Sequence, residues 1–335
     1  MDFSLSFYQS IAVFVISSIL VFYLCQKLSF LVDWIDSKFQ LGNAFGGTLI
    51  LSVVTNLPEI AITFNGALRG DTDLAVGNIL GGIVIQSVLL VLFDFANKKE
   101  SAPLSTLTNS KTSILQGLFL IIILVIAIGG AQLNNHAFFA RFTIPEVAIA
   151  GTWVLSLIAM KKFQSVEKID IVSPGQKASK LTKTSSIIYL SLISILVLVF
   201  GVLLENSSNV IATHLHINGI IFGATVLAVI TSLPEISGGL AFVKKKLYEP
   251  IISDIFGGNA FLPVLFLPAT LISNKSILPH SSHLDIYLTA VAILITSVYL
   301  IGMVISLPKK KLRLGIDSWV ILFFYLLSVI GMFYI

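Results

Sequence analysis

Two glutamates occupy equivalent places in two long apolar segments of the chain. Glu59 ends the sequence Thr-Asn-Leu-Pro-Glu, and Glu235 ends Thr-Ser-Leu-Pro-Glu. A carboxylate deep in an apolar segment is costly unless it is paired, protonated or ligated. No Lys or Arg lies within the apolar part of any such segment, so a basic side chain is not available as a partner. The two glutamates therefore predict a site for a mobile cation.

The proline before each glutamate indicates how further ligands arise. Pro58 and Pro234 each remove one helical hydrogen bond and clash with the preceding turn. This predicts freed carbonyl groups near Val54 and Ile230, beside the threonine hydroxyls. Carbonyl, hydroxyl and carboxylate oxygens suit a hard cation, although prolines that only kink their helices are the alternative. Two carboxylates can neutralise one Ca²⁺ or take up two monovalent cations, which fits exchange between them.

The motif belongs to an internal repeat. At an offset of 176 residues, GTLILSVVTNLPEI (47–60) aligns with GATVLAVITSLPEI (223–236), and eight of these fourteen positions are identical. At the same offset GNILGG (77–82) aligns with SDIFGG (253–258). Shared apolar composition explains Leu and Val, but not Gly, Thr, Pro and Glu in register. The chain is therefore predicted to be a duplication.

The second aligned segment adds further polar candidates. Asn78 and Asp254 are equivalent, and each is followed by two glycines that permit close helix approach. Gln86 and Asn259 lie further along the same segments and could line a cavity. Asp254 could instead serve as a structural charge near a helix N-terminus, or belong to a vestibule.

These residues must be positioned by membrane-spanning helices. Of the 335 residues 56% are hydrophobic and 11% charged, whereas soluble domains carry roughly a quarter charged residues. A span needs about 20 apolar residues. We expect an all-α integral membrane protein with ten spans, near 8–30, 43–68, 74–96, 112–132, 144–162, 185–204, 218–243, 251–272, 284–306 and 317–335.

Basic residues support this count. The chain has 21 Lys and Arg, and threading ten spans leaves only Arg69, Arg141 and Lys275 on one side, so 18 share the other. The positive-inside rule then places both termini outside. This distribution explains the basic composition without a role in binding nucleic acid.

The one cysteine, Cys25, permits no intramolecular disulfide. No basic residue precedes the first span, which is expected to be retained, and the short loops suit a prokaryotic plasma membrane.

Five spans in each half mean that the two copies enter the membrane in opposite directions. We expect a first repeat over 1–163, a cytoplasmic linker over 164–183 and a second repeat over 184–335. Inverted repeats are typical of secondary transporters that bind substrate near the midplane. The first and sixth spans, without ionisable core residues, are expected to slide against the rest. Asp94 and Glu146 lie near span ends and are expected at the membrane interface.

With these residues in view, the sequence resembles the calcium/cation antiporter superfamily, in its sodium/calcium exchanger branch. The TNLPEI and TSLPEI segments, each followed by a Gly-rich helix, are similar to the two alpha repeats of that family. The resemblance implies Glu59 and Glu235 as shared ligands of calcium and the coupling ion, with Thr55 and Thr231 in support. Ser232 matches a hydroxyl ligand of the family, while Asn56 replaces one.

The sequence departs from the family pattern after each glutamate. Gly-Ser-Asn is usual there, followed three residues later by Asn or Asp. Here the serine positions are Gly82 and Gly258, the asparagine positions are Ile83 and Asn259, and the later positions are Gln86 and Leu262. A three-sodium stoichiometry is therefore not carried over.

We expect a Ca²⁺ antiporter driven by Na⁺, with no cofactor besides the transported ions. Coupling to H⁺ is the close alternative, because burial disfavours charged carboxylates, and another divalent cation could replace Ca²⁺. The expected partners are these cations and the lipid bilayer; the sequence specifies no protein partner. A non-transporting membrane scaffold is a further alternative. An intramembrane enzyme is disfavoured, since HExxH and GxSxG motifs are absent and no His lies in the core of a span.

Overall fold

The computed structural model describes residues 6–39, 53–98, 100–133, 143–164, 183–273, 277–278, 283–306 and 309–335. The regular elements of these residues are all helices, as predicted. They are α1 (Phe7–Phe39), α3 (Leu57–Arg69), α4 (Asp73–Ala96), α5 (Leu104–Leu107), α6 (Lys111–Ala131), α7 (Ile144–Gln164), α8 (Lys183–His214), α9 (Gly219–Phe222), π-helix η1 (Gly223–Leu227), α10 (Ala228–Thr231), α11 (Leu233–Lys245), α12 (Glu249–Phe261), 3-10 helix η2 (Leu262–Leu265), α13 (Phe266–Ser273), α14 (His283–Ile305) and α15 (Ile316–Gly331).

Helices coincide with all ten predicted spans. Six described segments are long and apolar enough to cross a membrane, and a seventh is the pair 219–231 and 233–245, bent by 43°. Two shorter apolar helices, 144–160 and 316–331, match the fifth and tenth spans. The second span contains α3, although most of its first half lies outside the described residues. The chain is an integral membrane protein with two inverted five-helix repeats.

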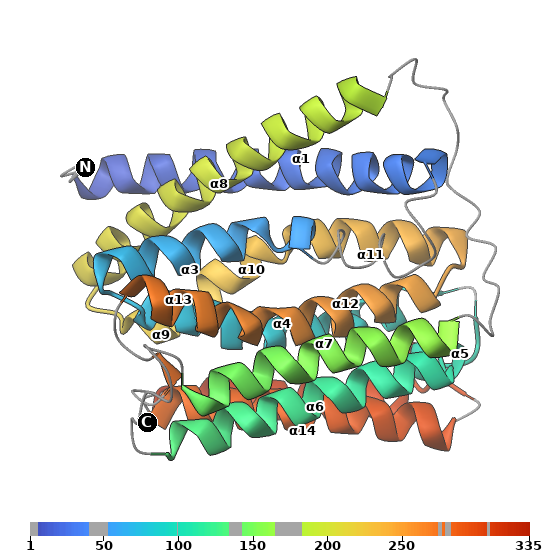
Figure 1. Ribbon diagram of the computed structural model, residues 1–335. Coiled ribbons are helices and arrows are strands. Elements are labelled where there is room, and N and C mark those ends of the chain that lie inside the picture. Colours follow the sequence, from blue (N-terminus) through green and yellow to red (C-terminus); the bar gives the residue numbers. More distant parts are fainter. Residues whose placement is uncertain are drawn as a thin grey trace.

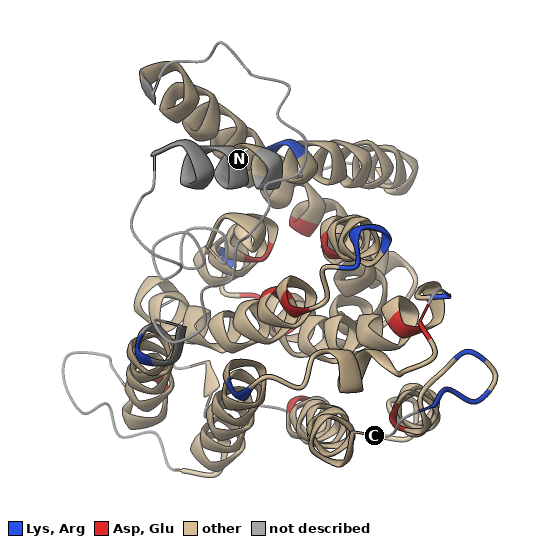
Figure 2. Ribbon diagram, turned by 90° about the vertical axis from the view of Figure 1, so that its right-hand side faces the viewer, with Lys and Arg blue, Asp and Glu red and all other residues tan. Residues whose placement is uncertain are grey.

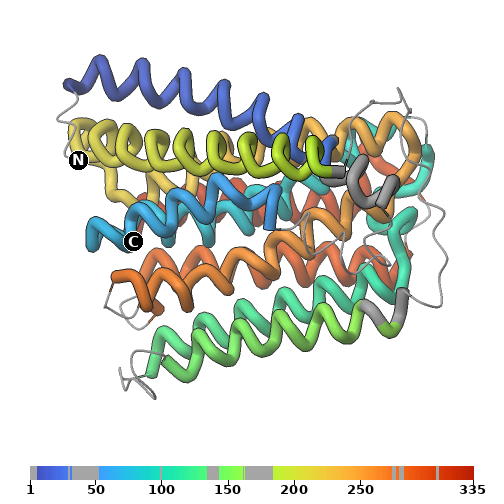
Figure 3. Tube along the Cα trace, turned by 45° about the horizontal axis from the view of Figure 1, so that its top comes forward, coloured from blue at the N-terminus to red at the C-terminus, as the bar shows by residue number. Residues whose placement is uncertain are grey.

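The helices form a bundle with α1 and α8 side by side on one face (Figures 1 and 3). Helix α4 runs through the centre, and 78% of its apolar window is buried. Its glycines allow the close approach predicted for this segment. A β-carbon added at Gly81 would lie 2.2 Å from the Cα of Ala224, and one at Gly77 would lie 2.3 Å from the carbonyl oxygen of Ile220. The first repeat is therefore locked against η1 and α9 of the second.

The two ends of the bundle differ. Both termini lie at one end (Figure 1), which we call the termini end. Lys and Arg gather in loops and helix ends at the opposite end (Figure 2), which we call the basic end. Helix α3 runs toward the termini end and α11 toward the basic end (Figure 1), as an inverted repeat requires. Most of the predicted linker, 164–183, lies outside the described residues.

The two helices on the outer face are longer than expected. Helix α1 has 33 residues and α8 has 32. Helix α8 continues well beyond residue 204, where the apolar run ends, because Glu205, Asn206 and Asn209 bond to α3 and to the turn after it rather than facing water. Sequence hydropathy cannot detect such a continuation.

Candidate ion-binding site

Both predicted helix breaks are present. Helix α3 begins at Leu57, after Asn56 with φ −91° and ψ 17°. Helix α11 begins at Leu233, after Ser232 with φ −87° and ψ 0°. A proline at the start of a helix is favourable, because its missing N–H would have had no intrahelical partner. Each glutamate therefore lies in the first turn of a half-helix.

The two carboxylates are buried. Glu59 is 1% exposed and Glu235 is 6% exposed. Neither oxygen of Glu59, nor Oε2 of Glu235, accepts a hydrogen bond of normal geometry, although Thr231 lies beside Glu59. Among the described residues neither glutamate forms an ion pair. The positive ends of the half-helices favour negative charge here, and the carboxylate oxygens without a hydrogen-bond donor are available to a cation.

The carboxylates also interact with each other. Glu59 acts electrostatically on Glu235, and so does the half-buried Asp254. Like charges at such a position repel one another, and a bound cation or proton relieves the repulsion. The described residues contain no group of three His, Cys, Asp or Glu that could hold a metal ion. Hydroxyl, amide or carbonyl oxygens would therefore have to complete a cation site around the two glutamates.

Thr231 joins the two repeats at this point. Its hydroxyl donates to Oδ1 of Asn78 at 3.3 Å, or to the carbonyl of Ala228 at the same distance. Ser232, fully buried, donates its hydroxyl proton to Ala228 O at 2.7 Å. The Nδ2 of Asn78 is buried without an acceptor. Thr231, Ser232 and Asn78 thus present oxygen atoms beside the glutamates.

The carbonyl oxygens predicted to be freed by the prolines are only partly free at the second break. Backbone N–H groups at the end of α10 bond to the carbonyl oxygens of Ala228 and Ile230. Ile230 O therefore accepts one local hydrogen bond and keeps one lone pair. Thr55 and Asn56 are buried at the equivalent break, at 8% and 1% exposure.

Polar side chains lie on one flank of the site. A β-carbon at Gly258 would lie 3.5 Å from Nδ2 of Asn56 and 4.0 Å from Oε1 of Gln86. Asn259, fully buried, donates to Ile83 O at 3.4 Å and to Ser87 Oγ at 3.3 Å. The Nε2 of Gln86 and the Oδ1 of Asn259 are buried without partners.

The opposite flank is apolar. A β-carbon at Gly82 would have Leu262 Cδ1 as its neighbour, at 3.8 Å. Gly82 is the repeat equivalent of Gly258, and Leu262 is the equivalent of Gln86. The two flanks are therefore related by the repeat, but only one of them offers a side-chain oxygen at this position.

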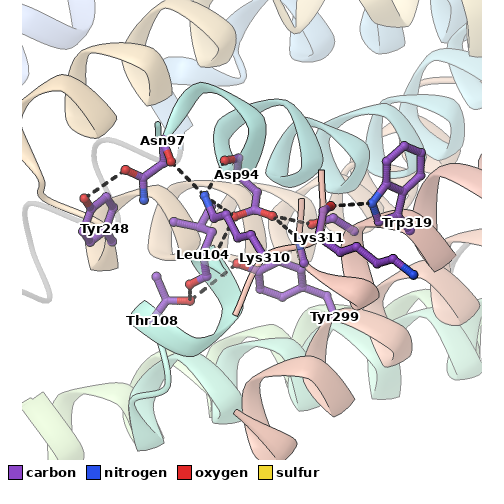
Figure 4. Close-up of polar contacts among 11 residues, drawn as sticks. Asp94, Asn97, Leu104, Thr108, Tyr248, Tyr299, Lys310, Lys311 and Trp319 are labelled. Carbon is purple, nitrogen blue, oxygen red and sulfur yellow. Dashed lines mark hydrogen bonds and ion pairs between the residues drawn. The ribbon is translucent and has the colours of Figure 1, made fainter. Parts of the chain in front are cut away.

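Asp94, expected at the membrane interface because it lies near the end of a span, is two residues before the end of α4 and faces protein rather than water. Asp94 is 1% exposed. Its carboxylate accepts hydrogen bonds from Leu104 N (2.8 Å), Gly315 N (2.7 Å) and Ser318 Oγ (3.0 Å), and pairs with Lys310 Nζ at 3.0 Å. Figure 4 shows Asp94 and Lys310 within this network. The charge is satisfied by partners on α5, on α15 and in the loop before α15, so it anchors the basic end and is not a candidate ligand.

Glu146, also expected at the interface, lies in the first turn of α7 and is fully buried. Its Oε1 accepts a hydrogen bond from Thr270 Oγ1 at 2.5 Å. Thr270 Oγ1 in turn accepts the backbone N–H of Ile277 at 3.1 Å. This carboxyl group holds α7 to α13, away from the two site glutamates.

Glu205 was not recognised from the sequence. The sixth span was expected to lack ionisable core residues, yet Glu205 of α8 is fully buried. It accepts a hydrogen bond from the Asn65 side chain of α3. A buried acid just beyond an apolar run looks like the start of a loop in the sequence, and only the packing against α3 reveals it.

An all-helical membrane bundle of two inverted repeats, with a broken helix and a buried carboxylate in each, defines a secondary transporter. The sequence model of the family described as "Sodium/calcium exchanger protein" matches residues 9–130 and 185–334. The chain belongs to this family. The family is one of Ca²⁺/cation exchangers, and its members are transporters.

One related sequence and two solved structures illustrate the similarity. The inner membrane protein YrbG of Escherichia coli is 25% identical over 264 residues, covering 77% of this chain and 78% of YrbG. The H⁺/Ca²⁺ exchanger CAX aligns with a TM-score of 0.71 at 12% identity, covering 97% of this chain and 87% of that one. The sodium–calcium exchanger NCX_Mj aligns with a TM-score of 0.63 at 20% identity, covering 97% and 99%.

Proposed function

We propose that the chain exchanges Ca²⁺ for a monovalent cation by alternating access, with Glu59 and Glu235 as shared ligands. The observation that carries this proposal is a pair of buried carboxylates, each at the N-terminus of a half-helix, without a basic partner among the described residues. Two negative charges can be balanced by one divalent cation or by two monovalent ones.

The remaining oxygen ligands are proposed from their burial around the glutamates. They are Thr55, Asn56, Asn78, Gln86, Thr231, Ser232, Asp254 and Asn259. Hydroxyl, amide and carboxylate oxygens are what Ca²⁺ and Na⁺ prefer. Asp254 remains less buried than the others, and a role in attracting cations fits it as well as direct ligation.

Na⁺ is our first candidate for the coupling ion, because the Leu-Pro-Glu motif resembles that of sodium/calcium exchangers. The polar flank of Asn56, Gln86 and Gly258 supports this candidate, since the side-chain oxygen of Gln86 lies at this position. H⁺ is the second candidate. It is favoured by the apolar flank of Gly82 and Leu262, where a sodium ion would find no side-chain oxygen at these two positions.

The test is Ca²⁺ uptake by purified protein in proteoliposomes. One set of vesicles is loaded with Na⁺ at equal pH, and the other with acid and no Na⁺. Uptake driven by the outward Na⁺ gradient supports sodium coupling, and uptake driven only by the pH gradient supports proton coupling. Folded protein that gives no uptake under either gradient would contradict Ca²⁺ exchange. The orientation of the protein in the membrane is proposed from the positive-inside rule, which predicts that the basic end faces the cytoplasm.

A further inference from the structure

The half of α8 nearest the termini end is joined to α3 by side-chain hydrogen bonds. Asn65 Nδ2 donates to the Glu205 carboxylate, and it lies 3.2 Å from Oδ1 of Asn206. Arg69 donates to the same oxygen of Asn206. One amide and one guanidinium of α3 thus hold two consecutive residues of α8.

A third link lies one turn further out. Asn209 Nδ2 donates to Oδ2 of Asp71 at 2.6 Å. Asp71 belongs to the turn after α3, and its backbone N–H bonds to Gly66 O at 3.1 Å, which fixes the turn. We call these contacts the α3–α8 seam, made by Asn65, Arg69 and Asp71 on one side and Glu205, Asn206 and Asn209 on the other.

The seam continues toward the ion site through a close helix contact. A β-carbon at Gly201 of α8 would lie 2.5 Å from the Cβ of Ala61 and 3.3 Å from Pro58 O. The α8 backbone therefore lies directly against the helix break that carries Glu59. Because α8 covers this break, its separation from α3 would open a path from the termini end to the site.

The contact between α1 and α11 is the repeat equivalent of the contact between α3 and α8, but it lacks most of the polar residues that α3 contributes to the seam. There α1 meets α11, where Gln26 Nε2 donates to Ser237 Oγ at 2.5 Å, and Ser237 is the repeat equivalent of Ala61. The equivalents of Asn65 and Asp71 are Ala241 and Leu247. Neither side chain can form a hydrogen bond, so the crossing toward the basic end lacks two of the three links whatever residues face it.

We propose that the α3–α8 seam is a lock that keeps the ion pathway closed at the termini end and must break once in every transport cycle. This inference rests on the proposed alternating-access exchange. Since only one of two repeat-related crossings carries the full set of polar links, the resting protein favours the state closed at the termini end. A perfectly symmetric pair of repeats would show no such preference.

The chemistry of the seam makes the lock reversible. Glu205 is fully buried, and its Oε1 accepts no hydrogen bond. When the seam opens, water reaches this carboxylate and compensates for the lost amide donor. The cost of opening is then the loss of the amide hydrogen bond and of the attraction between Arg69 and Glu205, offset by the hydration of these groups. Removing the donor should shift the balance of the two states by about tenfold.

Cysteine labelling tests the lock directly. Thr63 is 2% exposed and lies one helical turn beyond Glu59 on the same face of α3, toward the termini end. Thr63→Cys is made together with Cys25→Ala, which removes the one native cysteine. Vesicles with the termini end outward are treated with a membrane-impermeant quaternary-ammonium methanethiosulfonate. Adding Asn65→Ala should accelerate labelling about tenfold.

Ser207→Ala is the matched control. Ser207 lies in the same part of α8 and is buried, but its hydroxyl donates to Leu203 O of its own helix at 2.7 Å. Its substitution should leave the labelling rate unchanged. Equal rates with and without Asn65→Ala, an equal effect of the control, or no labelling of any variant would overturn the proposal.

A crosslink provides the second measurement. Asn65→Cys with Glu205→Cys, in the Cys25→Ala background, is bridged by a short thiol-cleavable reagent. Bridging should abolish Ca²⁺ uptake, and reduction should restore it; uptake that continues in the bridged protein would overturn the lock. Labelling needs no transport, so the predicted labelling of the Thr63→Cys variants, together with a wild type that carries no Ca²⁺, would contradict the exchange alone. Normal exchange without a labelling effect would contradict the lock alone.

Discussion

The hydroxyl of Thr231 donates to the side-chain oxygen of Asn78 across 3.3 Å, and this bond joins the second repeat to the first beside Glu59. Both residues are buried, at 1% and 0% exposure. Helix α10 ends at Thr231, while Asn78 lies in the central helix α4. The bond therefore fixes the break in one repeat to the scaffold of the other.

Removing either partner of this bond should weaken Ca²⁺ binding. Asn78→Ala and Thr231→Val are each expected to raise the Ca²⁺ concentration for half-maximal uptake about tenfold, because a buried polar group loses its partner. The loss of binding free energy in the double variant should be smaller than the sum of the two single losses, since both substitutions remove the same bond. Uptake titrations of all three variants measure this.

Thr225→Val is the control for that series. Thr225 Oγ1 donates to Ile221 O of its own helical segment at 2.6 Å, so its loss should leave half-saturation nearly unchanged. Strictly additive effects of Asn78→Ala and Thr231→Val would show that the bond between them does not support the site.

Adding an amide to the apolar flank and removing the amide from the polar flank should change the Na⁺ dependence of uptake in opposite directions. Leu262→Gln supplies an amide oxygen next to Gly82, where the structure has only an apolar neighbour, and should strengthen the dependence of uptake on Na⁺. Gln86→Leu should weaken it. Leu262→Met keeps volume and apolarity and serves as the control. Na⁺ titrations in which Leu262→Gln and Leu262→Met behave alike would contradict the assignment of the flanks.

Much of this arrangement follows from local sequence. Apolar runs define the spans, Pro58 and Pro234 define the breaks, and the offset of 176 residues pairs the halves. These features depend on neighbouring residues, so periodicity and composition detect them. Glycine pairs likewise indicated the close approach that Gly81 makes with Ala224.

The polar contacts that the sequence did not predict are long-range. Asp94 and Lys310 are separated by more than two hundred residues, and Glu205 meets Asn65 across two repeats. Each of these acids lies at or beyond the edge of an apolar run. Without the packing, such an acid is indistinguishable from one that faces water at the membrane surface.

The Asp94–Lys310 pair should contribute strongly to stability. Lys310→Met leaves a buried carboxylate without its base, and such losses cost roughly 3–5 kcal/mol. The expected result is a clear drop in the melting temperature of the detergent-solubilised protein. Lys246→Met is the control, because its ion pair with Glu100 is solvent-exposed and such pairs contribute little to stability. Equal melting temperatures for the two variants would contradict this role.

Gly81 should tolerate no side chain. A β-carbon there would lie 2.2 Å from the backbone of Ala224, so Gly81→Ala must push α4 and η1 apart. We expect less folded protein in size-exclusion chromatography and loss of uptake. Gly129→Ala is the matched control, because its β-carbon would meet no atom within 4 Å. Normal folding and uptake of Gly81→Ala would show that the contact between the repeats is looser than described.

The central claim, that Glu59 and Glu235 carry the exchanged cations, is tested most directly by Ca²⁺ uptake in matched glutamine variants. Glu59→Gln and Glu235→Gln each remove one negative charge from the site and should reduce gradient-driven uptake to the level of empty liposomes. Glu146→Gln changes another fully buried glutamate, bonded to Thr270 away from the site, and should retain uptake. Uptake that persists in folded Glu59→Gln or Glu235→Gln protein, or that is lost equally in Glu146→Gln, would contradict the account.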